Sequence, residues 1–116
     1  MLRSFSYAAH AALVAASDNR PDIVGRLEPR AHLWEASVGA AFLTAYRQTT
    51  ADTAIVPADD RRFEQLLDAF ILNKALYEVG YELASRPQWV GIPLLGILRI
   101  LNGLAGEECA ARIRRD

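Results

Sequence analysis

Apolar residues recur at helical spacing along residues 60–85, and this long periodic segment most constrains how the chain can fold. One set of positions, at i, i+4, i+7 and i+11, is Leu72, Leu76, Val79 and Leu83. The opposite side repeats the spacing with Phe70, Lys74, Tyr77 and Tyr81. The pattern predicts a long central helix with neighbours on both sides, capped by Asp59 or Asp60 and ended by Arg86 and Pro87.

Two more helices are expected before this segment. The first runs from about Leu2 to Ala16, where apolar residues recur at helical spacing, and the turn-rich residues 17–22 follow it. The second begins after Pro29, because proline suits the first turn of a helix, and its apolar stripe ends near Gln48.

The rest of the chain completes an all-α protein. Residues 49–60 form a loop by composition, and a fourth helix begins around Pro93, followed by a tail, residues 105–116, that is expected to fray. Residues 53–56 have some strand character but no second alternating run with which to pair. The sequence therefore predicts about four helices in a single domain, residues 1–116.

The composition fits a globular protein and argues against two classes of partner. Of the 116 residues, 52% are hydrophobic, which is enough for a packed core. The 13 basic and 14 acidic residues give a net charge of −1, so the chain lacks the basic field that binds nucleic acids or anionic membranes. We expect neither partner.

The cysteine content and the N-terminal residues favour a cytoplasmic protein. Cys109 is the sole cysteine, which excludes a disulfide framework and a thiolate-rich metal site and suits a reducing compartment. A signal or transit peptide is disfavoured, because the unbroken apolar run 11–16 is too short to cross a bilayer. The residues that interrupt the apolar stretch are Arg3, Ser4, Ser6 and His10.

No motif for an independent enzyme is found. The glycines are scattered, and the pair with P-loop spacing, Gly91 and Gly96, lacks the Lys and the Ser or Thr that should follow. Neither His10 nor His32 is followed by the aspartate of a kinase catalytic loop. These histidines and Cys109 have no metal-ligand spacing, so both histidines are interpreted as ordinary interfacial residues.

Two glutamates in the long segment have two interpretations. Glu78 and Glu82 lie one helical turn apart, and Arg86 follows Glu82 at i+4. Neighbouring carboxylates can act as paired acids, whereas i, i+4 pairs of Glu and Arg are common on exposed helix surfaces. We favour the exposed salt bridge.

Lys74, Tyr77 and Tyr81, here called the lysine–tyrosine row, have the chemistry that sugar binding requires. A tyrosine ring can stack on the C–H face of a sugar, its hydroxyl donates and accepts hydrogen bonds, and lysine adds a donor. The alternative is two half-buried packing tyrosines beside a lysine that reaches solvent. Spacing alone favours packing, because aromatic stripes at helical period usually belong to a core.

Several segments are similar, in order and spacing, to the C-terminal part of bacterial maltokinases, including forms fused to trehalose synthase. The segments are MLRSFSYAAHAAL, a Trp followed later by FLTAY, and LLDAFILNKALYEVGYELASRPQWVGIPLLGILRIL, covering about Met1 to Leu101. The most specific block is NKALYEVGYELASRPQWVGIP. Asn73 stands in place of an acidic residue of the family and Gly80 in place of a larger one, which lowers the expected local stability.

The resemblance implies the helical C-terminal lobe of a protein-kinase-like fold, of the aminoglycoside and choline kinase group. Such enzymes use ATP and magnesium to phosphorylate the anomeric hydroxyl of maltose, giving maltose 1-phosphate for α-glucan synthesis. By the same resemblance, Lys74, Tyr77 and Tyr81 would line the maltose pocket, contacting hydroxyls and stacking on a glucose ring. Trp89 would pack the lobe.

The resemblance also implies that the ATP-binding lobe and the catalytic and magnesium-binding aspartates precede the position matching Met1. We therefore expect a truncated or split C-terminal lobe that holds no cofactor and is inactive without an N-terminal lobe, with trehalose synthase as a further possible partner. The competing hypothesis is a stand-alone helical interaction module, such as a homodimer that buries the apolar surface an N-terminal lobe would cover.

Overall fold

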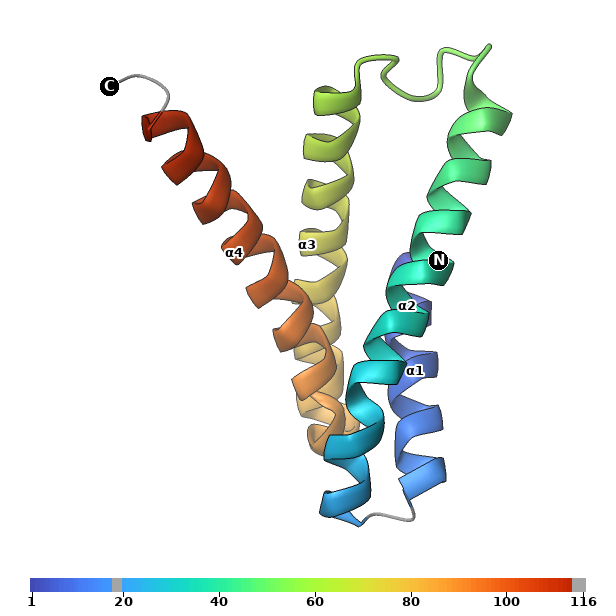
Figure 1. Cartoon of the computed structure of the whole chain (residues 1–116), viewed down its shortest axis with the longest axis vertical. Coiled ribbons are helices and arrows are strands. Elements are labelled where there is room, and N and C mark those ends of the chain that lie inside the picture. The colour runs from blue at the N-terminus through green and yellow to red at the C-terminus, as the bar shows by residue number, and fades with distance from the viewer. Residues whose placement is uncertain (18–19, 114–116) are drawn as a thin grey trace. The chain divides into compact units, whose positions relative to one another are not determined.

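The computed structural model describes the backbone of residues 1–17 and 20–113 and the side chains of residues 1–17 and 20–104. Within them the chain is all-helical, as the sequence predicts, and no strand occurs. The elements are α1 (Leu2–Ser17), α2 (Pro21–Thr50), α3 (Asp60–Ser85), the short 3-10 helix η1 (Pro87–Trp89) and α4 (Gly91–Ile113) (Figure 1). None of the helices in these ranges combines the length and the apolar character needed to span a membrane.

The chain divides into two compact units, Met1–Glu64 and Gln65–Asp116, and the boundary falls inside α3. The first unit contains α1, α2, the loop that follows and the first turn of α3. The second contains the rest of α3, then η1 and α4. The assignment of residues 1–116 to a single domain stays a prediction.

In the first unit, α1 lies along α2 (Figure 1), and aromatic side chains connect the two helices. The ring of Phe5 meets the rings of Trp34 and Phe42 edge-on, with centroid separations of 6.4 and 6.0 Å. The Phe42 ring in turn stacks on Tyr46, with centroids 6.1 Å apart. Edge-on and stacked pairs at these distances are favourable beyond the area that they bury, so this cluster stabilises the helix pair.

A hydrogen bond between side chains also links α1 to α2. The Ser6 hydroxyl donates a hydrogen bond to Glu35 Oε1, and the largely buried Arg3 donates one to Ser6 Oγ over 3.4 Å. Gly39 faces Leu2 of α1, and a Cβ at this position would lie 3.6 Å from Leu2 Cδ2, an ordinary van der Waals distance, so the packing does not require glycine there.

The start of α2 corrects the sequence analysis, which expects the helix to begin after Pro29. The helix begins at Pro21, preceded by Arg20 in an extended conformation. Pro21 takes the first helical turn, where its missing N–H costs no helical hydrogen bond. Pro29 instead lies inside the helix, where it removes the amide that would donate to the carbonyl of Gly25. The helix continues past this proline because the residues on both sides of it favour a helix.

The other expected boundaries agree closely with the structure. α3 has the predicted bounds, and α1 ends at Ser17, one residue beyond the expected end. α4 begins at Gly91, so Pro93 lies in its first turn, where proline is tolerated. The tail expected to fray is helical through Ile113, and its last residues lie outside those described.

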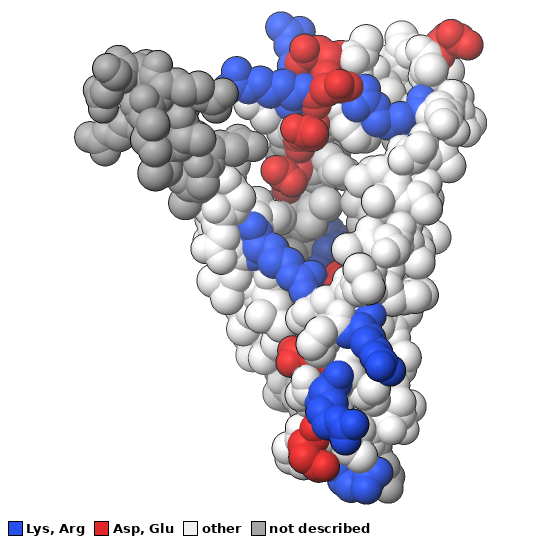
Figure 2. Space-filling view, in the orientation of Figure 1, with Lys and Arg blue, Asp and Glu red and all other residues white. Residues whose placement is uncertain are grey.

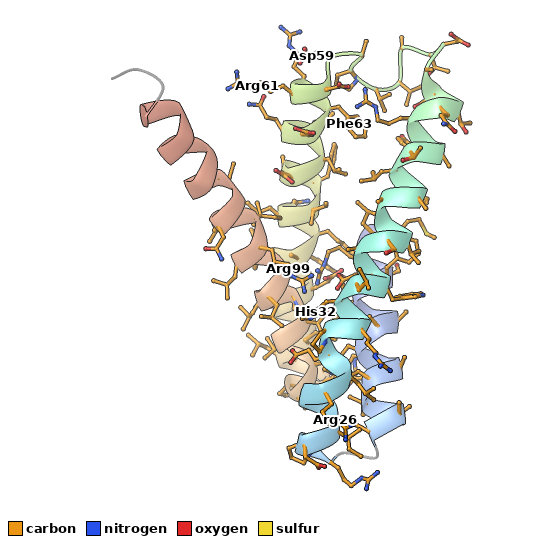
Figure 3. All side chains as sticks on the ribbon, viewed as in Figure 1. Arg26, His32, Asp59, Arg61, Phe63 and Arg99 are labelled. Carbon is orange, nitrogen blue, oxygen red and sulfur yellow. The ribbon has the colours of Figure 1, made fainter. Side chains whose placement is uncertain are left out.

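Asp59 caps α3, as the sequence predicts. Its Oδ1 accepts a hydrogen bond from the Arg62 amide at 2.8 Å. Arg47, at the end of α2, has Nη2 2.6 Å from Asp60 Oδ1 and its guanidinium 4.6 Å from the centroid of the Phe63 ring. Phe63 is buried and points from the first turn of α3 toward the end of α2 (Figure 3). These contacts hold the end of α2 and the first turn of α3 together at the two ends of the loop.

In the second unit, the prediction that α3 has neighbours along both apolar edges is wrong. The exposed residues of the two edges, with exposed fractions of 50–66%, are Phe70, Leu76, Tyr77, Tyr81 and Leu83. The buried positions lie between the edges and are Ala75, Glu78 and Glu82. Hydrophobic periodicity does not predict burial of this face, because the buried residues are one small residue and two charged ones.

Candidate functional site

The lysine–tyrosine row lies on one face of α3, because positions i, i+3 and i+7 of a helix share a face. All three side chains are exposed, Tyr77 by 66% and Tyr81 by 50%. Tyr77 is more exposed than the alternative of two half-buried packing tyrosines expects, whereas Tyr81, with half of its surface exposed, is compatible with that alternative. The structure thus brings together the three residues that the sequence singles out and leaves them accessible.

A positive charge lies against each tyrosine ring of the row. Lys74 Nζ is 4.7 Å from the centroid of the Tyr77 ring, and the guanidinium carbon of Arg86 is 5.7 Å from that of the Tyr81 ring. Both distances allow cation–π attraction, which extends to about 6 Å. The face therefore offers aromatic surface and hydrogen-bond donors side by side.

Arg86 connects this row to the corner between α3 and η1. Its Nε and Nη2 donate to the two carboxylate oxygens of Glu82, at 3.0 and 2.7 Å. The same guanidinium lies 4.8 Å from the centroid of the Trp89 ring, while the Trp89 amide donates to the Arg86 carbonyl at 2.8 Å. One side chain thus contacts a ring of α3 and a ring of η1.

The predicted pair of Glu82 and Arg86 is confirmed, but the expectation that it is an exposed surface pair is wrong. Glu82 is only 1% exposed, and the neighbouring Glu78 is 7% exposed. A buried carboxylate requires strong partners, and the two parallel bonds from the guanidinium of Arg86 supply them to Glu82.

The contacts of Arg86 with the Tyr81 and Trp89 rings were not predicted from the sequence, and Trp89 was expected only to pack the lobe. The available signal was the order Tyr81, Arg86, Pro87, Trp89. Pro87 disfavours a helical conformation of Arg86, so α3 ends at Ser85, and the 3-10 turn then brings Trp89 against the Arg86 guanidinium.

Other residues that the sequence analysis weighed do not form a site. No group of three or more His, Cys, Asp or Glu side chains that could hold a metal ion occurs among the described residues. His10 is half-buried, as expected at an interface, but His32 on α2 is exposed (Figure 3). The side chain of Cys109 lies outside those described. The face shown in Figure 2 carries both basic and acidic side chains.

No family model matches the chain, and no solved structure gives a significant match. Function is therefore inferred from the side chains of α3 and η1. Tyrosine, tryptophan and lysine side chains are able to stack on a ring and to form hydrogen bonds with hydroxyl groups.

Proposed function

We propose that this chain is the sugar-binding helical part of a maltokinase, acting in the cytoplasm with an ATP-binding lobe. The observation that carries the proposal is the lysine–tyrosine row, exposed on one face of α3 with a cation against each ring. The similarity of NKALYEVGYELASRPQWVGIP to the corresponding block of maltokinases supports it from the sequence.

Each residue of the row has a role in this proposal. The rings of Tyr77 and Tyr81 stack on the C–H face of a glucose unit, and their hydroxyl groups and the Lys74 ammonium bind sugar hydroxyls. ATP and magnesium bind to the other lobe, because phosphoryl transfer needs a positioned metal and donors around the γ-phosphate. The chain alone is therefore expected to bind maltose and to transfer no phosphate.

Reconstitution tests this proposal. The 116-residue chain is mixed with a separately expressed ATP-binding lobe of a maltokinase, and the formation of maltose 1-phosphate is measured with ATP and magnesium. We expect maltose 1-phosphate to form only when both parts are present. The Tyr77→Ala/Tyr81→Ala double variant should give no product. Leu83→Ala, on the opposite and equally exposed edge of α3, is the matched control and should retain activity. An inactive mixture in which the chain also fails to bind maltose would contradict the proposal.

A second candidate function, a helical interaction module, is favoured by the apolar surface of α4. Its leucines with exposed fractions of 44–53% are Leu94, Leu95, Leu98, Leu101 and Leu104. Contiguous apolar surfaces of this kind usually contact another protein. An ATP-binding lobe, trehalose synthase or a second copy of the chain would each cover it.

Sedimentation of the isolated chain distinguishes the two candidates. A stable homodimer that does not bind maltose favours the interaction module. A monomer that associates when the ATP-binding lobe is added favours the maltokinase proposal.

A further inference from the structure

We propose that Arg86, held by Glu82, is a positioning residue for sugar binding and that it presents Tyr81 and Trp89 as one continuous surface. This inference rests on the proposed function, and it extends the lysine–tyrosine row past the end of α3 onto η1. Trp89 becomes part of the sugar-binding surface instead of a packing residue.

The anchor of this arrangement is buried, whereas the Tyr81 side chain is exposed and the Trp89 side chain is half-buried. Glu82 is 1% exposed, and its two oxygens accept the parallel bonds from Arg86 at 3.0 and 2.7 Å. A guanidinium bound through two parallel bonds is fixed in its plane as well as in its position. The orientation of the Arg86 side chain is therefore set from beneath the surface.

The fixed guanidinium in turn restrains two rings from different elements. Its carbon lies 5.7 Å from the Tyr81 centroid on α3 and 4.8 Å from the Trp89 centroid on η1. An exposed ring without such a neighbour changes rotamer within nanoseconds. A ring already held in one orientation loses less conformational entropy when a ligand binds, so restraint of Tyr81 and Trp89 strengthens sugar binding.

A purely structural role and a positioning role of the Glu82–Arg86 pair predict different sugar affinities when the pair is replaced. Removing one partner of a buried pair leaves an uncompensated charge, but replacing both partners by apolar residues of similar volume often preserves stability. The double variant Glu82→Leu/Arg86→Met therefore removes the guanidinium while retaining the fold. If the pair is only structural, sugar affinity is unchanged in this variant.

The test compares variants of the full 116-residue chain by calorimetric titration with maltose and by thermal unfolding. We expect Glu82→Leu/Arg86→Met to unfold near the parent temperature and to bind maltose about three- to tenfold more weakly, the range that loss of aromatic contacts implies. Arg86→Lys, which keeps the charge and the fold without the planar fork, should weaken binding in the same direction. Arg61→Met, at an exposed position in the first turn of α3 (Figure 3), is the control and should bind as the parent does.

Fluorescence supplies a readout that does not depend on the sugar. The chain has two tryptophans, so Trp34→Phe leaves Trp89 as the only tryptophan, which can be excited selectively over the four tyrosines. In this background, loss of Arg86 should raise the quenching of Trp89 by acrylamide.

Unchanged affinity and unchanged quenching in both the double variant and Arg86→Lys, with maltose binding by the parent intact, would overturn this inference alone. Absence of maltose binding by the parent chain would overturn the proposed function and the sugar-binding role of Arg86 together.

Discussion

At the scale of single residues, the cations of the lysine–tyrosine face determine which side of each ring a sugar can use. Lys74 and Arg86 each lie against one ring, so the C–H face of a sugar is expected to pack on the other side. Exposed cation–π contacts contribute only about 0.5–1 kcal/mol. That is small enough for Lys74 to exchange its ring contact for hydrogen bonds to sugar hydroxyls.

Substitutions of the tyrosines separate stacking from hydrogen bonding. Tyr81→Phe should weaken maltose binding by about tenfold at most, because a single hydrogen bond is lost, and Tyr81→Ala should weaken it further, because the ring is lost as well. Calorimetric titration measures both. Tyr46→Phe on α2, another partly exposed tyrosine, is the control. Equal affinities for the parent, Phe and Ala forms would contradict the proposed stacking role.

Removal of Arg86 alone should also cost stability. Arg86→Ala leaves the buried carboxylate of Glu82 without its bidentate partner, and we expect unfolding to become easier by about 2–3 kcal/mol. This cost is below the roughly 3–5 kcal/mol usual for breaking a fully buried pair, because the arginine side chain is itself 43% exposed. Urea unfolding measures the change, and Arg61→Ala should alter it by less than about 0.5 kcal/mol. Equal effects of the two substitutions would show that the Glu82 carboxylate finds other partners.

At the scale of the elements, capping residues and prolines predict a helix end well only where the flanking sequence does not favour continuing the helix. Asp59 and Pro87 bound α3 as expected, because a cap and a helix-stopping proline work through adjacent backbone groups. Pro29 misled the sequence analysis, because the same residue type also occurs inside a helix that the flanking sequence maintains.

The cap of α3 gives one prediction at this scale. Asp59→Ala removes the acceptor for the Arg62 amide and should lower the free energy of unfolding by about 1 kcal/mol. Asp52→Ala, in the exposed loop before the helix, should change it little. Chemical denaturation of both variants measures the difference, and equal stabilities would rule out a contribution from the cap.

The middle of α3 gives a second prediction at this scale. Gly80 is exposed, and no neighbouring atom lies within 4 Å of the place of a Cβ, so nothing in the structure requires glycine there. Gly80→Ala should raise the free energy of unfolding by about 0.5–1 kcal/mol through helix propensity. Gly91→Ala, at the first residue of α4, should have a smaller effect. A loss of stability in Gly80→Ala would contradict the open environment of this position.

At the scale of the whole molecule, the sequence predicts the class of fold and the composition of the candidate face, but not which face of α3 is buried. Helical spacing without paired strands leads directly to an all-α chain, and the spacing of Lys74, Tyr77 and Tyr81 places them together. Burial of Glu78 and Glu82 depends on tertiary contacts and on an ion-pair partner, and hydrophobic periodicity does not encode either. The division into two units likewise depends on contacts between segments distant in sequence.

Lys74 permits the most direct measurement of the central claim, because it is the only lysine of the chain. Reductive methylation with carbon-13 formaldehyde labels its side chain and the N-terminal amine, and methylation keeps the positive charge. The intact chain is then titrated with maltose and followed by nuclear magnetic resonance, with sorbitol, which has no ring, as the control. We predict that maltose shifts the Lys74 methyl signal to saturation while the N-terminal signal and the sorbitol titration show no change. A Lys74 signal that stays fixed through the maltose titration, or that moves equally with sorbitol, would contradict a sugar-binding role for this face.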